Sequence, residues 1–196
     1  MRYRRSPEEV NERAARIKLL LLDVDGVLTD GGILLHPDGE ESKVFNVRDG
    51  LGIRLLQRAG IEVGLISGRS SRVVTRRAED LGIGLVAQGT LYKLPAYEEI
   101  LGKRGLTDRD VAYVGDDIVD IPILKQVGLA VATAGAVAAV ASSCHVITDR
   151  DGGRGAVREV CELILQAQGR WEEMAGPFLA SFFPPGAASP STGSGP

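Results

Sequence analysis

Short apolar runs alternate with helix-like segments along most of this 196-residue chain, and this alternation constrains the fold more than any other feature. The runs are bounded by Gly or polar residues, which suits strands that are buried on both faces. We expect strands at 17–22, 62–66, 84–87, 111–114, 129–131 and 146–147, and helices at 50–59, 71–81, 92–103, 119–126 and 155–168. This order predicts an α/β fold, a Rossmann-like parallel sheet flanked by helices on both sides.

One segment interrupts the alternation directly after the first strand. Apolar residues at 32–35 and 42–47 flank the turn sequence Pro37-Asp38-Gly39, which predicts a β-hairpin at about 32–47. We therefore expect an N-terminal extension at 1–16, one domain at 17–170 that carries the hairpin, and a C-terminal tail at 171–196. From residue 184 the tail contains only Pro, Gly, Ala, Ser and Thr, a composition that has nothing to pack.

The charge and the apolar pattern exclude several kinds of partner. The net charge is -3 and no long run of Lys or Arg occurs, which disfavours binding to nucleic acid. No apolar stretch approaches the ~18 residues of a membrane span, and no signal peptide is recognisable. We therefore expect a cytoplasmic protein, in which Cys144 and Cys161, without a CxxC pattern, are reduced thiols.

Polar residues with related chemistry follow the predicted strands. The first strand is followed by Asp23-Val24-Asp25-Gly26, the second by Ser67-Gly68-Arg69, and the fourth by Gly115-Asp116-Asp117 with Asp120 one turn on; Lys93 opens a helix. Because parallel strands bring their carboxyl ends to one edge, these residues are expected to converge there.

The converging residue types suit phosphoryl transfer. Asp23 and Asp116 can share a hard divalent cation such as Mg²⁺, and a carboxylate can also attack phosphorus. Asp25 can protonate the leaving oxygen and later deprotonate water. Ser67 and nearby amides can hold phosphate oxygens, while Lys93 neutralises charge on the nucleophile and on the phosphate.

These motifs resemble the haloacid dehalogenase superfamily, and in particular its branch that dephosphorylates 3-deoxy-D-manno-octulosonate 8-phosphate. The resemblance spans about residues 17 to 169 and is carried by LLLDVDGVLTDGG, KVFNVRDGLGIRLLQRAGIEVGLISGRSS, KLPAYEEIL, VAYVGDDIVDIPIL and GGRGAVREVCELILQAQG. It implies hydrolysis through an aspartyl-phosphate on Asp23, as a step toward lipopolysaccharide. It also implies an acid/base role for Asp25, whose backbone carbonyl joins Asp23 and Asp116 on Mg²⁺, with Asp117 and Asp120 in support.

The same resemblance implies how substrate is recognised. Phosphate is held by Ser67, Gly68 and Lys93, and the sugar acid by Arg69 and Arg77, whose guanidinium groups suit a carboxylate. Thr29, Asp30 and Gly31 lie in the loop that would line the pocket. Only the hairpin fills the usual insertion point of a cap domain, so we expect a capless body that forms homotetramers, in which a neighbouring subunit completes each site.

Two alternatives remain open on the sequence. Related capless phosphatases act on nonulosonic (sialic-type) acid 9-phosphates, but they carry Glu at the position of Arg69. A receiver-like signalling module also combines a parallel sheet with clustered carboxylates and a Lys. Its phospho-acceptor Asp follows the third strand, where this chain has Ala87-Gln88-Gly89.

Overall fold

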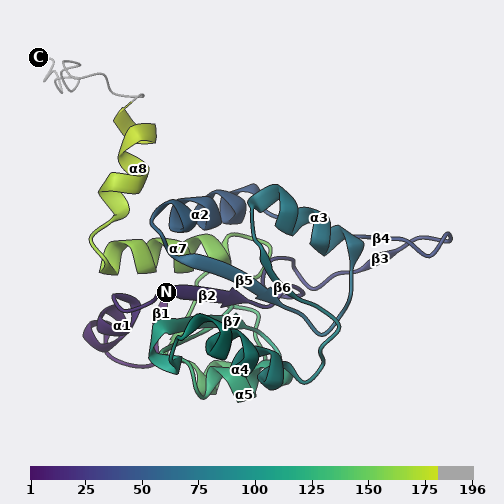
Figure 1. Ribbon diagram of the computed structural model, residues 1–196, viewed down its shortest axis with the longest axis horizontal. Coiled ribbons are helices and arrows are strands. Elements are labelled where there is room, and N and C mark those ends of the chain that lie inside the picture. The colour runs from purple at the N-terminus through teal and green to yellow at the C-terminus, as the bar shows by residue number, and fades with distance from the viewer. Residues whose placement is uncertain (181–196) are drawn as a thin grey trace, which may run out of the picture.

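A seven-stranded sheet forms the centre of the protein in a computed structural model that describes residues 1–180 (Figure 1). The strand order is β1-β9-β8-β7-β2-β5-β6, and every neighbouring pair is parallel except β1 with β9. The strands are β1 (Arg2–Tyr3), β2 (Leu19–Leu22), β5 (Glu62–Ile66), β6 (Leu85–Ala87), β7 (Val111–Gly115), β8 (Leu129–Ala132) and β9 (Val146–Ile147). The predicted α/β fold with a parallel sheet is confirmed.

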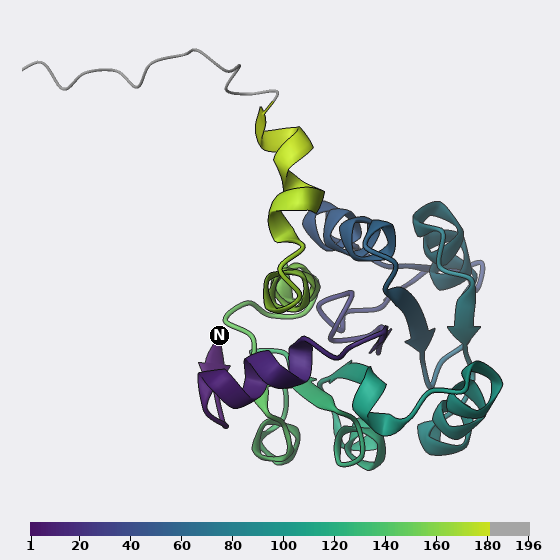
Figure 2. The same ribbon diagram turned by 60° about the vertical axis from the view of Figure 1, so that its left-hand side comes forward.

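Helices cover both faces of the sheet, because successive side chains of each buried strand point to opposite faces. On β2, Leu20 and Leu22 join one apolar cluster, whereas Leu19 and Leu21 join the other. The first cluster packs against α1 (Pro7–Ala14), α2 (Val47–Arg58), α3 (Arg72–Leu81) and α7 (Ala156–Ala167). The second packs against α4 (Lys93–Arg104), α5 (Ile121–Leu124) and α6 (Ala138–Ser143), and Figure 2 shows the two layers on either side of the strands.

The predicted hairpin is present as β3 (Leu34–Leu35) and β4 (Glu41–Ser42), a separate two-stranded sheet that extends past the end of the main sheet (Figure 1). It is shorter than expected: β4 ends at Ser42, and residues 43–46 lead without regular structure into α2, which begins at Val47. The short 3-10 helices Asp108–Asp110 and Ile118–Asp120 precede β7 and α5.

The N-terminal segment, which was predicted to be an extension at 1–16, is structured. Strand β1 pairs with the edge strand β9, and α1 buries Val10 and Ala14 in the core. Helix α1 is capped by Ser6, whose hydroxyl accepts a hydrogen bond from the Glu9 amide at 3.1 Å.

The tail that was expected from residue 171 begins with α8 (Trp171–Ala180), which projects away from the body (Figure 1). Trp171 joins the edge of the core and stacks on Arg158 at 5.5 Å. The Pro- and Gly-rich segment from 184 lies outside the described residues. Within residues 1–180, no helix combines the length and the apolar character needed to cross a membrane.

Candidate active site

The site lies where three adjacent parallel strands end. Strand β2 lies between β5 and β7, with Leu22 level with Leu65 of β5 and Val114 of β7. The loops that follow these strands therefore start beside one another. The backbone amide of Asp23 continues the pairing of β2 with β7, because it donates to the Val114 carbonyl at 3.0 Å.

A buried lysine joins two of the carboxylates. Lys93, at the start of α4, places Nζ 2.7 Å from Oδ1 of Asp23 and 2.7 Å from Oδ1 of Asp120. All three side chains are almost inaccessible to solvent. The two anions keep the ammonium charged, since a buried charge is stable only when it is paired.

Asp120 organises the opposite side of this pair. Its Oδ1 also accepts the hydroxyl of Tyr113 at 2.7 Å, and its Oδ2 accepts the amides of Asp116 and Asp117 at 3.0 and 3.3 Å. One fully buried carboxylate therefore fixes the lysine and the backbone of the loop that carries Asp116.

Burial, with neighbouring charge, raises the pKa values of two carboxylates of the cluster, those of Asp23 and Asp116. Burial raises the pKa of Asp23 to about 6, with Asp120 adding to the effect and Lys93 opposing it. Burial, followed by the charges of Asp23 and Asp120, raises the pKa of Asp116 to about 7. For Lys93 burial disfavours the ammonium, but Asp23 and Asp120 outweigh it and raise its pKa. Excess negative charge in a buried site is characteristic of a place where a cation binds.

The acidic cluster can hold a divalent metal ion. Oxygens of Asp23, Asp116 and Asp120 all lie within 4.8 Å of one another, and Oδ1 of Asp116 is buried without a hydrogen-bond partner among the described residues. We favour Asp23 and Asp116 as ligands over Asp120, because both oxygens of Asp120 already accept hydrogen bonds. The donor set is all oxygen, which suits Mg²⁺.

Gly26 allows the loop after β2 to approach Asp116. Its φ is +92°, and a Cβ at this position would lie 2.0 Å from Oδ2 of Asp116. Only glycine satisfies both conditions, the left-handed backbone and the close approach.

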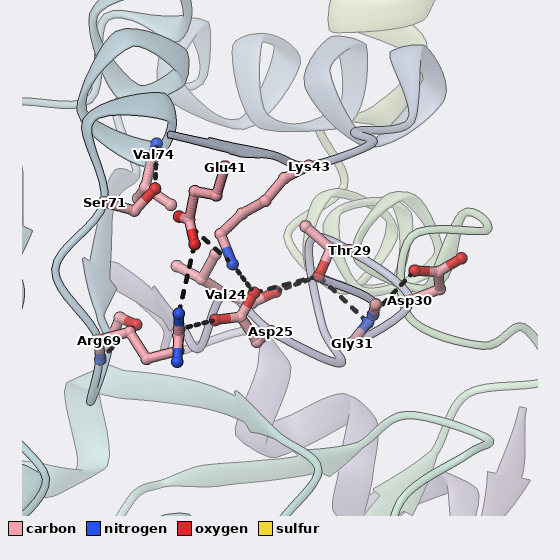
Figure 3. A network of polar contacts seen from close by, with 12 residues as sticks. Val24, Asp25, Thr29, Asp30, Gly31, Glu41, Lys43, Arg69, Ser71 and Val74 are labelled. Carbon is pink, nitrogen blue, oxygen red and sulfur yellow. Dashed lines mark hydrogen bonds and ion pairs between the residues drawn. The ribbon is translucent and has the colours of Figure 1, made fainter. Parts of the chain in front are cut away.

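Asp25 lies in the same loop but makes its contacts on the other side, toward the hairpin (Figure 3). Its Oδ1 pairs with Nζ of Lys43 at 2.5 Å and lies 3.5 Å from the hydroxyl of Thr29. Its Oδ2 lies 3.9 Å from Nε of Arg69. Thr29 in turn accepts the amide of Gly31 at 3.2 Å, which shapes the loop.

The remaining phosphate and substrate residues expected from the sequence lie in the loop after β5 and on α3. Ser67 is buried directly after β5 and is followed by Gly68. The guanidinium of Arg69 reaches the hairpin, where it pairs with Glu41 at 3.3 Å. Arg77 lies on α3, where its guanidinium stacks over Phe45 at 5.5 Å. The Nε atom of Arg77 is buried without a hydrogen-bond partner in the described part of the chain.

Sequence reasoning missed three residues that contact the site. Lys43 and Glu41 belong to the hairpin, where local sequence does not reveal which loop of the body they will meet. Tyr113 lies within the apolar run of β7, where an aromatic residue is expected to serve only the core. Its position three residues before Asp116 places its hydroxyl next to Asp120.

Comparison with known proteins identifies the class. A family model described as haloacid dehalogenase-like hydrolase matches residues 85–159. The 3-deoxy-D-manno-octulosonate 8-phosphate phosphatase KdsC of Yersinia pestis is 48% identical over 169 residues, 86% of this chain and 90% of that protein. With a strand-end carboxylate cluster on this fold, the chain is a phosphoric monoester hydrolase of the haloacid dehalogenase type.

Solved structures give the same result at the level of the fold. The Yersinia pestis 3-deoxy-D-manno-octulosonate 8-phosphate phosphatase has a TM-score of 0.83 and 49% identity, over 84% of this chain and 89% of that one. The Moraxella catarrhalis phosphatase, in complex with magnesium, phosphate and KDO, has a TM-score of 0.85 and 40% identity, over 90% and 99%. The cobalt-bound Haemophilus influenzae phosphatase has a TM-score of 0.81 and 42% identity, over 85% and 99%. This chain belongs to the 3-deoxy-D-manno-octulosonate 8-phosphate phosphatase family.

Proposed function

We propose that this chain hydrolyses 3-deoxy-D-manno-octulosonate 8-phosphate to the free sugar acid and phosphate, with Mg²⁺ as its cofactor. One observation carries the proposal: the buried Asp23–Lys93–Asp120 arrangement beside Asp116, in a chain 48% identical to a phosphatase named for this substrate. The free sugar acid is a precursor of lipopolysaccharide, and we assign the reaction to the cytoplasm.

Asp23 is the proposed nucleophile. Its carboxylate attacks phosphorus, so that an Asp23–phosphorus bond forms while the bond to the substrate's O8 breaks. Asp25 gives its proton to the departing oxygen. Water then attacks the phosphorus of the aspartyl-phosphate, its proton passes to Asp25, and phosphate leaves with both aspartates restored.

Charge compensation is what lets a carboxylate approach a phosphate. Asp23, Asp116 and the backbone carbonyl of Asp25 would hold Mg²⁺, which when bound neutralises charge on the transferred group. Lys93 supplies a fixed positive charge next to Asp23, and the Ser67 hydroxyl is available to a phosphate oxygen.

Arg69 favours a sugar acid over a neutral sugar phosphate. Half of its side-chain surface (51%) is exposed, and its guanidinium pairs with Glu41 and lies 3.9 Å from Asp25. A substrate carboxylate can take the place of Glu41 on this fork. Arg69 also favours this substrate over the alternative, a nonulosonic acid 9-phosphate, because phosphatases for that substrate carry Glu at this position. We leave Arg77 as a second candidate, although it would have to leave its stack on Phe45.

The test is a substrate panel with and without metal. Purified protein is assayed for phosphate release from the octulosonate 8-phosphate, a nonulosonic acid 9-phosphate and neutral sugar phosphates, in Mg²⁺ or in excess chelator. The octulosonate ester is expected to have the highest kcat/KM, and chelation is expected to stop turnover. Preference for the nonulosonic ester, or full activity in chelator, would contradict the proposal.

We also propose that the protein is a homotetramer in which hairpins of neighbouring copies meet. Leu34 and Leu35 of β3 are 62% and 71% exposed, and Val44 and Val47 lie further along the same segment, also exposed. Apolar side chains gathered on one projecting hairpin indicate a contact surface. Sedimentation should give four times the chain mass, and replacing Leu34 and Leu35 by Ser should shift the protein toward smaller species; a wild-type monomer would refute it.

A further inference from the structure

Four side chains form a closed ring of alternating charge between the hairpin and the loops after β2 and β5 (Figure 3). Lys43 Nζ pairs with Asp25 Oδ1 at 2.5 Å and lies 3.9 Å from Glu41 Oε1. Arg69 closes the ring, with Nη2 3.3 Å from Glu41 Oε2 and Nε 3.9 Å from Asp25 Oδ2. The proposed acid/base therefore faces two cations, Lys43 at its Oδ1 and Arg69 at its Oδ2.

The two cations differ in how firmly they are held. The side chain of Lys43 is 0% exposed, and its short contact is the one to Asp25. Glu41 Oε1 lies 3.9 Å from the Lys43 ammonium and has no hydrogen-bond partner within the described residues. It therefore balances the charge of Lys43 without taking the hydrogen bond that Lys43 donates to Asp25. Arg69 is half exposed and its contact with Asp25 is long. It can turn to a substrate carboxylate while Lys43 stays.

The direction in which Asp25 points decides whether it can serve the reaction. Its carboxyl must reach the leaving oxygen in one step and water in the next, and a displacement of about 1 Å in such a group can cost roughly 10²-fold in rate. Thr29, 3.5 Å away, is too far to hold it alone. A buried ammonium at 2.5 Å can.

We propose that Lys43 is a positioning residue for Asp25: its ammonium, backed by Glu41, holds the acid/base carboxylate in its working orientation. The inference rests on the proposed function, in which Asp25 protonates the leaving oxygen. It also gives the hairpin a task in catalysis within its own chain, in a body without a cap domain.

The experiment compares two aryl phosphates that carry no carboxylate, so that recognition by Arg69 does not enter. Phenol has a pKa of about 10 and needs a proton as it leaves, whereas 4-nitrophenol is a far stronger acid and needs little help. We measure kcat/KM, which reports only the steps through phosphoryl transfer, for Lys43→Met and Lys43→Arg. Lys43→Met should lose about tenfold more on phenyl phosphate than on 4-nitrophenyl phosphate, and Lys43→Arg should recover most of this difference.

A double-mutant cycle with Asp25→Asn distinguishes positioning from folding. If Lys43 acts through Asp25, Lys43→Met should cost less than about twofold once Asp25 is already Asn. Lys43→Gln is made in parallel in case the Met variant folds poorly, and melting temperatures are recorded for all. The matched control is Lys103→Met, a surface lysine that pairs with Glu99 on the same helix; it should leave both esters unchanged.

The outcomes separate this inference from the proposed substrate. Equal losses on the two esters, or the full loss repeated in the Asp25→Asn background, would overturn the role of Lys43. Failure to hydrolyse the octulosonate ester, with the leaving-group effect of Lys43→Met intact, would overturn the proposed substrate and leave the role of Lys43 standing.

Discussion

Replacing Asp120 by Asn tests whether one buried carboxylate organises the site. Asp120 is fully buried and accepts from Lys93, Tyr113 and two amides of its own loop. Asn has nearly the same volume but only one acceptor oxygen. In either orientation its NH₂ group faces donors, the loop amides in one case and the Lys93 ammonium in the other.

The expected magnitude follows from these contacts. Removing one partner of a buried ion pair costs about 3–5 kcal/mol. Asn keeps roughly half of the polar contacts, and losing the charge of Asp120 relieves the repulsion that helps to raise the pKa values of Asp23 and Asp116. We therefore expect a loss of about 2–3 kcal/mol in the free energy of unfolding, or about 5–10 °C in Tm for a chain of this size. The displaced lysine should lower kcat roughly 10²-fold.

The assay is urea unfolding and thermal melting at neutral pH, with kcat measured on the same samples. Asp117→Asn is the matched control, because the exposed Asp117 caps the following turn, in which its side chain accepts the Ile118 amide at 2.7 Å, and Asn caps equally well. It should move Tm by less than about 2 °C. Wild-type stability and kcat in Asp120→Asn would refute the reasoning.

Three further predictions follow from single features of the structure. Asp23 and Asp116 must be ionised to bind a cation, and their pKa values are raised to about 6 and about 7. Titration calorimetry should therefore show the affinity for Mg²⁺ falling about tenfold or more per pH unit below pH ~6. An affinity that does not change with pH would contradict this. Gly26→Ala should lower activity about 10²-fold, because the added Cβ collides with Asp116 and displaces it. Gly39→Ala is the control: at φ +87° it carries the same backbone strain, but nothing lies within 4 Å of its Cβ, so this variant should stay active. Burial lowers the pKa of His145 to about 4, and its ring accepts a strand amide. Because the folded pKa lies below the unfolded one, stability should decrease by about 1–2 kcal/mol as pH falls from 6.5 to 4, after allowance for partial exposure, and denaturant unfolding of His145→Gln should lack this component.

The parallel sheet could be predicted because its signal is local. The run at β5 was predicted at 62–66 and is Glu62–Ile66 in the structure, and the strand ends gave Asp23, Ser67 and Asp116. Strand β1 could not be found in this way, since its two residues become a strand only by pairing with β9. Helix α6 was also missed, because its six residues, three Ala, two Ser and one Val, are too few and too uniform to show a periodic apolar pattern.

The candidate site was predictable where residues follow strands and unpredictable where they depend on a distant segment. Asp25 was identified by its spacing from Asp23, but its partner Lys43 comes from the hairpin, whose docking depends on tertiary contacts. For Arg77, the sequence could not reveal the stack on Phe45, and its role in binding substrate stays a prediction. The placement of Tyr113 beside Asp120 required the register of β7.

The central claim, that Asp23 is phosphorylated during turnover, is open to direct measurement. Enzyme with Mg²⁺ is mixed with the radiolabelled octulosonate 8-phosphate, stopped with acid within milliseconds, digested, and its labelled peptide sequenced by mass spectrometry. The label should lie on Asp23, disappear on treatment with hydroxylamine, and be missing from Asp23→Asn. Label on a different residue, or steady turnover by Asp23→Asn, would contradict the claim.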